Sequence, residues 1–170
     1  KEVCIMNIQK ISTFSFKAKP NNYAEINSYV SRSAQPNKED FAWLKDQGVT
    51  DVINFRTMVV EGVDFNEETE VLKQGMRYHN IPSVTKSPTK ENVNKFLNLI
   101  AEIENRSGKA HIHCKAGADR TGMYAFIYKM LKGIGTLAGN EREWLEHGHN
   151  TKLYPDLRNW AKNFIKMVKK

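Results

Sequence analysis

Hydrophobic positions along the chain fall into two kinds of segment. Short apolar runs bounded by turn-forming residues predict buried strands at residues 26–30, 49–55, 76–81 and 110–113. Segments with apolar residues three or four positions apart predict helices at residues 39–47, 67–74, 91–105, 121–131, 137–147 and 155–168. Because strands alternate with helices, the pattern predicts an α/β fold. Its central sheet is mostly parallel and flanked by helices, with a ligand site at the carboxyl ends of the strands.

The N-terminal segment lacks such a pattern. Residues 1–22 mix Ser, Lys and Asn with isolated apolar positions and end in Lys19-Pro-Asn-Asn22, which predicts an irregular arm. A chain of 170 residues with 40% hydrophobic content is long enough for one domain with its own core. We therefore expect an irregular arm over residues 1–22 and a single domain over residues 23–170.

Composition narrows the range of partners. The chain carries 26 Lys and Arg against 19 Asp and Glu, a formal net charge of +7, which either attracts anionic substrates or only solvates the surface. No nucleic-acid-binding motif accompanies the charge, so nucleic acid is not an expected partner. No apolar run approaches the roughly 20 residues that cross a bilayer, so we expect a soluble protein without a membrane span. The chain begins at Lys1 rather than Met, which is compatible with export after cleavage of a signal peptide and leaves the compartment open.

The two cysteines have different characters. Cys4 and Cys114 lie far apart, with neither a CxxC pair nor a Cys/His cluster at metal-ligand spacing, so we expect neither a metal nor another cofactor. Cys4 resembles an ordinary small apolar residue. Cys114 follows a histidine and lies in a glycine-bearing loop, which is typical of a reactive thiol; a buried structural thiol is the alternative.

The segment around Cys114 carries the strongest chemical signal. Residues 113–122 read His-Cys-Lys-Ala-Gly-Ala-Asp-Arg-Thr-Gly, between a predicted strand and a predicted helix. The pattern has six fixed positions, which are His113, Cys114, Gly117, Arg120, Thr121 and Gly122. At about 5% usage per residue type, such a pattern arises by chance in a chain of this length on the order of 10⁻⁶ of the time. Backbone N–H groups in such a turn converge above the sulfur and, with the helix N-terminus, form an anion site. The loop residues expected to bind phosphate in this way are Lys115, Ala116, Gly117 and Ala118.

Arg120 completes this anion site. Its planar guanidinium binds two phosphoryl oxygens at once and stabilises their charge in the transition state, which lysine could not do with the same geometry. Gly117 permits backbone torsions that a side chain would resist. The loop therefore predicts a phosphate-transfer or phosphate-binding site.

With these residues in place, the sequence resembles the Cys-x5-Arg protein tyrosine and dual-specificity phosphatases of the compact bacterial type. The stretches Ser31-Arg-Ser-Ala-Gln-Pro36 and Gly48-Val-Thr-Asp-Val-Ile-Asn-Phe-Arg56 extend the resemblance over roughly residues 29–132. It implies a dual-specificity phosphatase-like fold and a metal-free reaction, in which Cys114 attacks phosphorus and water hydrolyses the phosphocysteine. It also implies that Thr121 hydrogen-bonds the sulfur and that His113 orients the loop.

The sequence leaves the general acid open. Relatives usually supply an Asp two or three dozen residues before the cysteine, but residues 81–90 contain no carboxylate. Asp119 resembles the acid position of a subset of bacterial phosphatases and is the favoured candidate, with a role in holding the loop as its alternative. The other readings are a carboxylate from a different segment or no acid at all. The carboxylates considered are Glu61, Asp64, Glu67 and Glu68.

Lysines bear on the substrate. Lys115 and Lys86, with Lys90, add charge near the loop or are ordinary solvated lysines. The resemblance of Lys115 to phosphatases of phosphoinositides and inositol polyphosphates, including phytases, favours an inositol phosphate substrate. The alternatives are a phosphotyrosine or dual-specificity protein phosphatase and a phosphate-binding pseudophosphatase. A sulfurtransferase or arsenate reductase is disfavoured, because arsenate reduction usually recruits further redox cysteines. The expected partner is thus a phosphorylated small molecule or a phosphoprotein.

Overall fold

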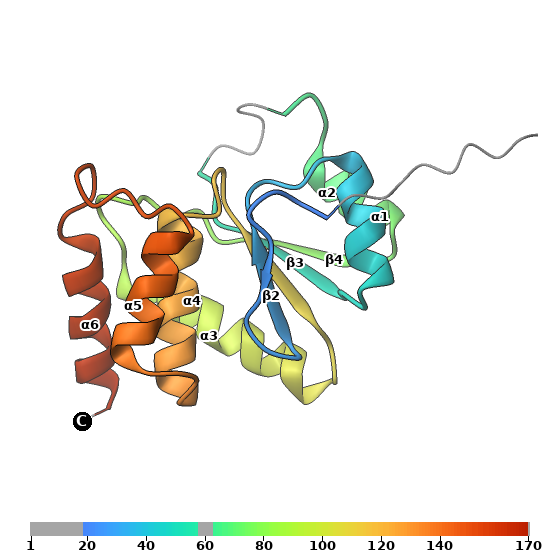
Figure 1. Cartoon of the computed structure of the whole chain (residues 1–170). Coiled ribbons are helices and arrows are strands. Elements are labelled where there is room, and N and C mark those ends of the chain that lie inside the picture. The colour runs from blue at the N-terminus through green and yellow to red at the C-terminus, as the bar shows by residue number, and fades with distance from the viewer. Residues whose placement is uncertain (1–18, 58–62, 170) are drawn as a thin grey trace, which may run out of the picture.

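The computed structural model describes residues 19–57 and 63–169 of the chain. Its centre is a five-stranded sheet in the order β1-β2-β5-β3-β4. Figure 1 labels β2, β3 and β4 of this sheet. β1 runs antiparallel to β2, and the other neighbouring strands pair in parallel. The strands are β1 Ala24–Glu25, β2 Val30–Ser33, β3 Asp51–Asn54, β4 Arg77–Asn80 and β5 Ala110–His113. The expected α/β fold with a mostly parallel sheet is confirmed. Of the arm predicted over residues 1–22, residues 1–18 lie outside the described part of the chain.

Helices cover both faces of this sheet. α1 and α2 lie against one face, while α3, α4, α5 and α6 form the layer on the other (Figure 1). Their bounds are α1 Lys38–Asp46, α2 Glu67–Lys73, α3 Lys90–Asn105, α4 Asp119–Lys132, α5 Leu137–Glu146 and α6 Leu157–Val168. Each predicted helix is present, with its ends in place or shifted by at most two residues, because caps rather than periodicity decide where a helix ends.

Side-chain caps begin α1, α2, α3 and α5 but not α4 or α6. The Asn37 side chain accepts from the N–H of Asp40, whose carboxylate accepts from the Asn37 N–H in return. Thr89 and Thr136 cap α3 and α5 through their hydroxyl oxygens. The N-cap of α4 is Ala118, which offers no side-chain acceptor. The first N–H groups of α4 therefore remain available to an acceptor from outside the protein.

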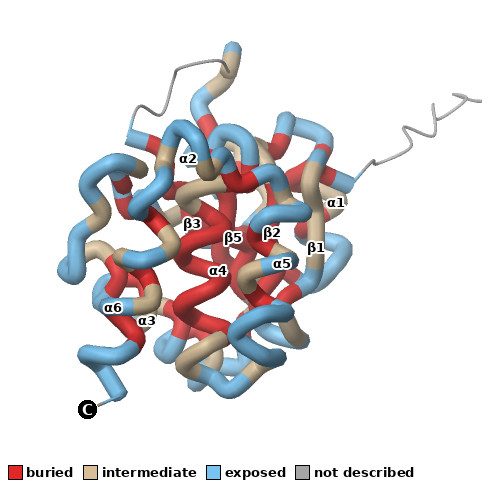
Figure 2. The backbone as a smooth tube through the Cα atoms, turned by 60° about the vertical axis from the view of Figure 1, so that its left-hand side comes forward, coloured by how far each residue is buried: buried red, intermediate tan, exposed pale blue. Residues whose placement is uncertain are grey.

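Two hydrophobic clusters fill the space on either side of the sheet. The larger lies towards α3–α6 and includes Phe55 and Tyr124, whose stacked rings have centroids 3.9 Å apart. The smaller lies under α1 and α2 and includes Phe41 and Val71. β5 is buried throughout and α4 over most of its length (Figure 2). The loop that joins them is therefore anchored at both ends in the core.

The strand predicted at residues 26–30 is wrong in position. β2 begins only at Val30, because the Asn27 side chain accepts hydrogen bonds from the backbone N–H groups of Tyr29 and Val30 and closes a turn. Across this turn the N–H of Ile26 donates to the carbonyl oxygen of Val30. The apolar pattern did not reveal this side-chain turn. Because of this turn, the polar residues 31–33 lie in the sheet in place of residues 26–29.

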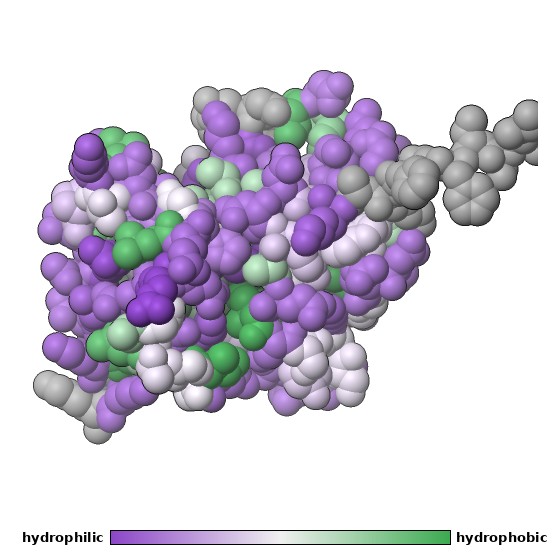
Figure 3. Space-filling view, viewed as in Figure 1, coloured by the Kyte–Doolittle hydropathy of each residue, from purple (hydrophilic) through white to green (hydrophobic). Residues whose placement is uncertain are grey.

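The surface seen in Figure 3 is mainly hydrophilic, with separate hydrophobic patches. The larger exposed apolar side chains come from different elements and are Tyr29, Leu72, Val84, Leu137, Leu145, Leu153, Met167 and Val168. Within residues 19–57 and 63–169, no helix is both long and apolar enough to cross a membrane.

Candidate active site

The loop of residues 114–118 leaves β5 at the sheet edge where the parallel strands have their carboxyl ends. Cys114 is only 2% exposed. It lines a cavity of about 240 Å³ with Thr85, Lys115, Ala116, Asp119, Arg120 and Tyr154. The fold thus brings the predicted residues Cys114, Asp119 and Arg120 together at one cavity.

The shape of the loop depends on a close approach between Gly117 and the end of β2. Gly117 has a φ angle of +68°, and a Cβ atom there would lie 2.5 Å from backbone atoms of Ser33 and Ala34. From β2, Arg32 Nη2 donates a hydrogen bond of 2.6 Å to the Gly117 carbonyl oxygen. Burial is the main cause that lowers the pKa of Arg32 to about 10. β2 therefore supports the loop through both backbone contact and a buried guanidinium.

The carbonyl oxygens of the loop are bonded away from the cavity. The Gln35 N–H donates to the Lys115 carbonyl at 3.1 Å, and the Asn22 side chain donates to the Ala116 carbonyl at 3.0 Å. In a trans peptide plane the next N–H points opposite to the carbonyl. The N–H groups of residues 116–118 therefore face away from these partners, as an anion site requires.

A buried polar network lies at the base of the loop. His113 Nε2 and Glu67 Oε1 are 2.6 Å apart, and both side chains are completely buried. The other carboxylate oxygen of Glu67 accepts from Gln35 at 3.1 Å and from Asn54 at 2.9 Å. Gln35 in turn accepts a 2.6 Å bond from Arg56.

Burial and the contacts of this network shift the pKa of Glu67. Burial raises the pKa of Glu67, but the charge and hydrogen bond of His113, with smaller contributions from Gln35, outweigh burial and hold that pKa below its ordinary value. Both of its oxygens are engaged, and it does not line the cavity of Cys114. The structure therefore gives Glu67 a place in the support of the loop rather than beside the leaving group.

His111, two residues before His113 on β5, is a separate core histidine. Its ring nitrogens lie 2.9 Å and 2.8 Å from the hydroxyls of Ser31 and Ser33. Burial, with the adjacent His113, lowers the pKa of His111 well below its ordinary value. It does not line the cavity of Cys114.

Arg120 and Thr121 occupy the first turn of α4. Arg120 Nη1 donates to the Phe55 carbonyl oxygen at 3.3 Å, and the side chain lines both the Cys114 cavity and an adjoining cavity of about 300 Å³. Thr121 is buried, and its hydroxyl has no hydrogen-bond partner among the described residues. The hydrogen bond expected between Thr121 and the Cys114 sulfur is therefore not made in this structure.

Asp119 lies in the wall of the cavity but is not isolated there. Its Oδ1 is 2.7 Å from His149 Nδ1 and accepts a 2.8 Å bond from the backbone N–H of Asn150. Its side chain is 20% exposed. The geometry is compatible with both sequence-based alternatives, an acid that faces the cavity and a carboxylate that holds the loop.

The remaining acid candidates lie elsewhere. Asp64 is exposed and lines a different cavity, of about 630 Å³, with Lys115 and Arg56. Glu68 is exposed on α2. Glu61 lies outside the described residues.

The three lysines separate into two groups. Lys115 lines the Cys114 cavity, and Lys86 lines the adjoining cavity that Arg120 shares. Of the two readings left open for Lys90, the structure favours the ordinary solvated lysine, because Lys90 is exposed and lines neither of these cavities. Lys90 begins α3, which places it beside Trp160 at a separate cavity.

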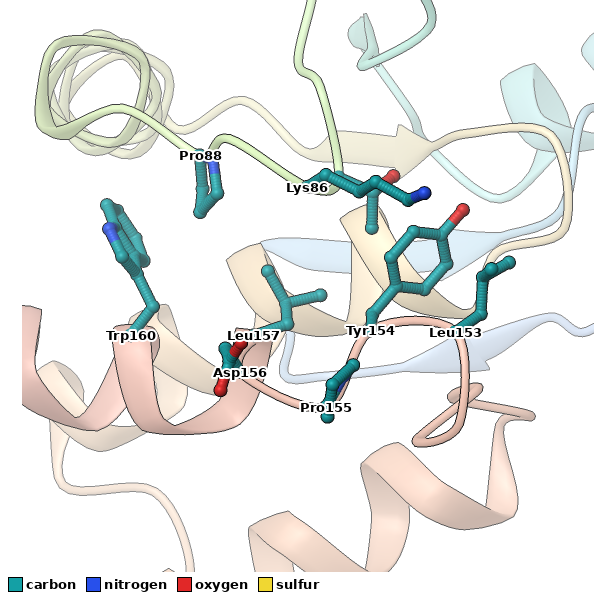
Figure 4. Close-up of a pocket in the computed structure, with 9 residues that line it drawn as sticks. Lys86, Pro88, Leu153, Tyr154, Pro155, Asp156, Leu157 and Trp160 are labelled. Atoms are coloured by element: carbon teal, nitrogen blue, oxygen red, sulfur yellow. The ribbon is translucent and has the colours of Figure 1, made fainter.

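Sequence reasoning missed the residues that complete the cavity from other segments. Thr85 and Tyr154 line both the Cys114 cavity and the adjoining one. With Lys86, they also line a third cavity of about 260 Å³, which has Trp160 at its far end (Figure 4). No local pattern marks Thr85 or Tyr154, because their loops meet the phosphate loop only in the folded chain.

Comparison with protein families decides the class. The family described as "DSP-PTPase phosphatase fused to NAD+ Kinase" matches residues 1–158 of the chain. The chain belongs to this family. It is a cysteine-based phosphatase, a phosphoric monoester hydrolase of the tyrosine and dual-specificity superfamily.

Curated relatives of the phosphatase are longer than the chain. It is 27% identical over 135 residues to a beta-lactamase hydrolase-like protein of Xylella fastidiosa, a match that covers 76% of this chain and 29% of that protein. Tyrosine-protein phosphatase CDC14 of Candida albicans is 30% identical over 93 residues, 46% of this chain and 16% of that protein. The phosphatase thus spans less than a third of either relative.

Solved structures share its fold. A DUF442 protein of Shewanella putrefaciens is 25% identical with a TM-score of 0.71, covering 87% of this chain and 93% of that one. TpbA of P. aeruginosa in complex with pTyr is 21% identical with a TM-score of 0.65, covering 85% and 83%. The catalytic core of the PP-IP phosphatase SIW14 of S. cerevisiae is 18% identical with a TM-score of 0.67, covering 88% and 86%. The dual-specificity phosphatase-like fold is confirmed.

Proposed function

We propose that this phosphatase hydrolyses phosphate monoesters through a phosphocysteine at Cys114 and that its substrate is a polyanionic inositol phosphate or phosphoinositide. One observation carries the proposal: Cys114, Arg120 and the uncapped first turn of α4 meet at a single cavity. A thiolate, a guanidinium and a helix N-terminus are the groups needed to attack and bind a phosphoryl group.

The reaction has two steps. Sγ of Cys114 forms a bond to phosphorus while the bond from phosphorus to the leaving oxygen breaks, and Asp119 gives that oxygen its proton. Arg120 and the loop N–H groups bind the nonbridging oxygens and stabilise their charge. A water molecule then attacks phosphorus and loses a proton to Asp119, the bond from sulfur to phosphorus breaks, and phosphate leaves. His113 supports the loop from below throughout.

The charge around the opening favours a polyanion. The described residues that line the Cys114 cavity and its neighbour include three cations, Lys86, Lys115 and Arg120, against one carboxylate, Asp119. A substrate with several phosphates would gain more from this excess than one with a single phosphate. The fold relationship to SIW14, described as a PP-IP phosphatase, is consistent with this choice.

Phosphotyrosine is the second candidate, and the third cavity favours it. Pro88, Leu157 and Trp160 give that cavity apolar walls next to Lys86 and Tyr154 (Figure 4). An apolar side chain beside a phosphotyrosine would fit such walls, whereas an inositol phosphate would not use them. The fold relationship to TpbA, described in complex with pTyr, is consistent with this candidate.

Replacement of the nucleophile tests the mechanism. We expect Cys114→Ser to abolish phosphate release from p-nitrophenyl phosphate while orthovanadate, a phosphate analogue, still binds, because the serine hydroxyl is a poor nucleophile here but the anion site survives. Cys4→Ser is the matched control and should retain activity. Turnover by Cys114→Ser would overturn the proposed mechanism.

The substrate is tested by comparing kcat/KM for inositol hexakisphosphate, a phosphoinositide and phosphotyrosyl peptides. The proposal requires a higher value for at least one inositol compound. A higher value for peptides with an apolar residue beside the phosphotyrosine would favour the second candidate instead.

A further inference from the structure

Asp119, which lines the Cys114 cavity, is paired with His149, a residue that has no part in the reaction described above. The His149 side chain is completely buried, whereas Asp119 keeps 20% of its side-chain surface exposed. One oxygen of Asp119, Oδ1, receives both contacts from this side, with His149 Nδ1 at 2.7 Å and the Asn150 N–H at 2.8 Å. Asp119 is therefore held from the interior while it still lines the cavity.

Packing fixes the orientation of the His149 ring. The ring stacks on Trp144, with centroids 4.7 Å apart and an angle of 28° between the planes. Trp144 in turn donates its indole N–H to the Ala118 carbonyl oxygen, at the end of the loop, at 3.1 Å. Gly122 makes this arrangement possible, because a Cβ atom there would overlap the indole ring. The histidine is thus locked to the start of α4, where Asp119 lies.

The second ring nitrogen indicates which tautomer is present. His149 Nε2 is buried and has no hydrogen-bond partner among the described residues. A proton on Nε2 would face no acceptor, whereas a proton on Nδ1 is donated to Asp119. The surroundings therefore favour the tautomer with its proton on Nδ1. Oδ1 of Asp119 then accepts two N–H bonds, which leaves Oδ2 as the oxygen that can carry the carboxyl proton.

We infer that His149 is a positioning residue that confines the transferable proton of Asp119 to Oδ2, on the way to the leaving oxygen. The inference rests on the proposed function, in which Asp119 is the general acid. As the bond from phosphorus breaks, its electron pair passes to the leaving oxygen, which takes the proton from Oδ2. The two N–H donors on Oδ1 stabilise the carboxylate that this transfer creates.

A pair of similar substrates tests the inference on the full chain. Phenyl phosphate has a poorer leaving group than p-nitrophenyl phosphate and depends more on the acid. We expect Asp119→Asn to lower kcat/KM for phenyl phosphate roughly 10²-fold and for p-nitrophenyl phosphate far less. His149→Leu should lower the phenyl phosphate value roughly tenfold, as for the loss of one hydrogen bond to a charged group, again with a smaller effect on the nitro compound.

Two amide variants separate positioning from packing. Asn at position 149 offers an N–H close to the place of Nδ1, whereas Gln offers one near Nε2. We therefore expect His149→Asn to recover most of the activity on phenyl phosphate and His149→Gln to behave like His149→Leu. In an Asp119→Asn background, His149→Leu should add no further selective loss. Inhibition by orthovanadate, which reports an intact loop, should change less than about twofold in these variants.

The outcomes distinguish the inference about His149 from the proposed role of Asp119 as the acid. Equal losses on both esters in His149→Leu, with weakened orthovanadate binding, would show that His149 only holds the loop, and the inference would be overturned. A selective loss in Asp119→Asn but not in His149→Leu would overturn the inference and leave the proposed acid standing. Equal losses on both esters in Asp119→Asn would remove Asp119 as the acid and the inference with it, while Cys114→Ser would still test the nucleophile separately.

Discussion

The polar residues beneath the phosphate loop and those around its opening are organised in opposite ways. The floor of the site, which we define as Arg32, Gln35, Arg56, Glu67 and His113, is largely buried and joined by hydrogen bonds to itself and to the loop. The rim, which we define as Thr85, Lys86, Lys115 and Tyr154, comes from three segments. Within the described part of the chain, neither Lys86 nor Lys115 has an ion pair, and both are exposed.

The difference follows from the cost of burial. A charged group inside the protein must have its partners in place, because an unpaired buried charge costs several kcal/mol. Floor residues are therefore fixed in one geometry, which suits the support of a reacting loop. Exposed lysines keep their hydration and can follow a ligand. We therefore propose that the floor fixes the chemistry, whereas the rim adjusts which phosphate ester is preferred.

We expect the largest loss of activity from a change at the contact between the phosphate loop and β2. In Gly117→Ala the added Cβ would meet the backbone of Ser33 and Ala34 at 2.5 Å, so the loop must move. A displacement on the order of 1 Å costs about 10²-fold in rate, and we expect kcat to fall at least that far. Steady-state kinetics on p-nitrophenyl phosphate measures the loss.

Gly133→Ala is the matched control for this prediction. Gly133 has a similar φ angle of +70°, but a Cβ atom there would have nothing within 4 Å. It should cost only the backbone strain of about 1–2 kcal/mol in the free energy of unfolding, with kcat unchanged. Equal kcat losses in both variants would show that strain, rather than the contact with β2, is responsible.

The buried pair of Glu67 and His113 gives the next largest effect, on stability. Glu67→Gln leaves His113 without its carboxylate, and we expect the free energy of unfolding at pH 7 to fall by about 3 kcal/mol. Urea denaturation measures this. Glu68→Gln, one position along and exposed, should be near neutral.

The same pair predicts a pH dependence. The folded protein holds the pKa of Glu67 below its ordinary value of 4.5, so the unfolded chain binds this proton at higher pH than the folded one does. The resulting stabilisation is complete above the ordinary pKa and is lost as the pH falls through the lower, folded pKa. The protein should therefore lose stability on acidification more steeply than Glu67→Gln does. Parallel acid profiles for the two would contradict the role of Glu67 in the floor.

Rim substitutions should have the smallest effects. Lys86→Ala and Lys115→Ala should each raise KM for inositol hexakisphosphate roughly threefold at low salt, with little change in kcat, because an exposed charge contributes modest attraction. The effect should shrink as the salt concentration rises. Lys90→Ala, at the separate cavity, is the control and should not change KM. A large fall in kcat in the Lys86 or Lys115 variant would place that lysine with the floor instead.

The features of this protein that depend on local geometry could be predicted from the sequence. The alternation of strands and helices, the loop that starts at Cys114 and the forked cation at Arg120 could all be predicted, because hydrophobic period and turn chemistry act over a few residues. Arg32 was not within reach, because the strand expected at residues 26–30 ends before it. The displaced start of β2 was not either, because the side chain of Asn27 rather than the apolar pattern closes the preceding turn.

The surroundings of the charged residues, in contrast, depend on the tertiary fold. Glu67 looked like a possible acid in the sequence, but packing of α2 against the sheet buries it against His113, 46 positions away. Asp119 meets His149 across 30 positions. Lys90 is the first residue of α3 and lines a cavity separate from that of Cys114. The state of a charged side chain depends on which distant groups the fold brings within a few ångströms of it, and no local pattern contains that information.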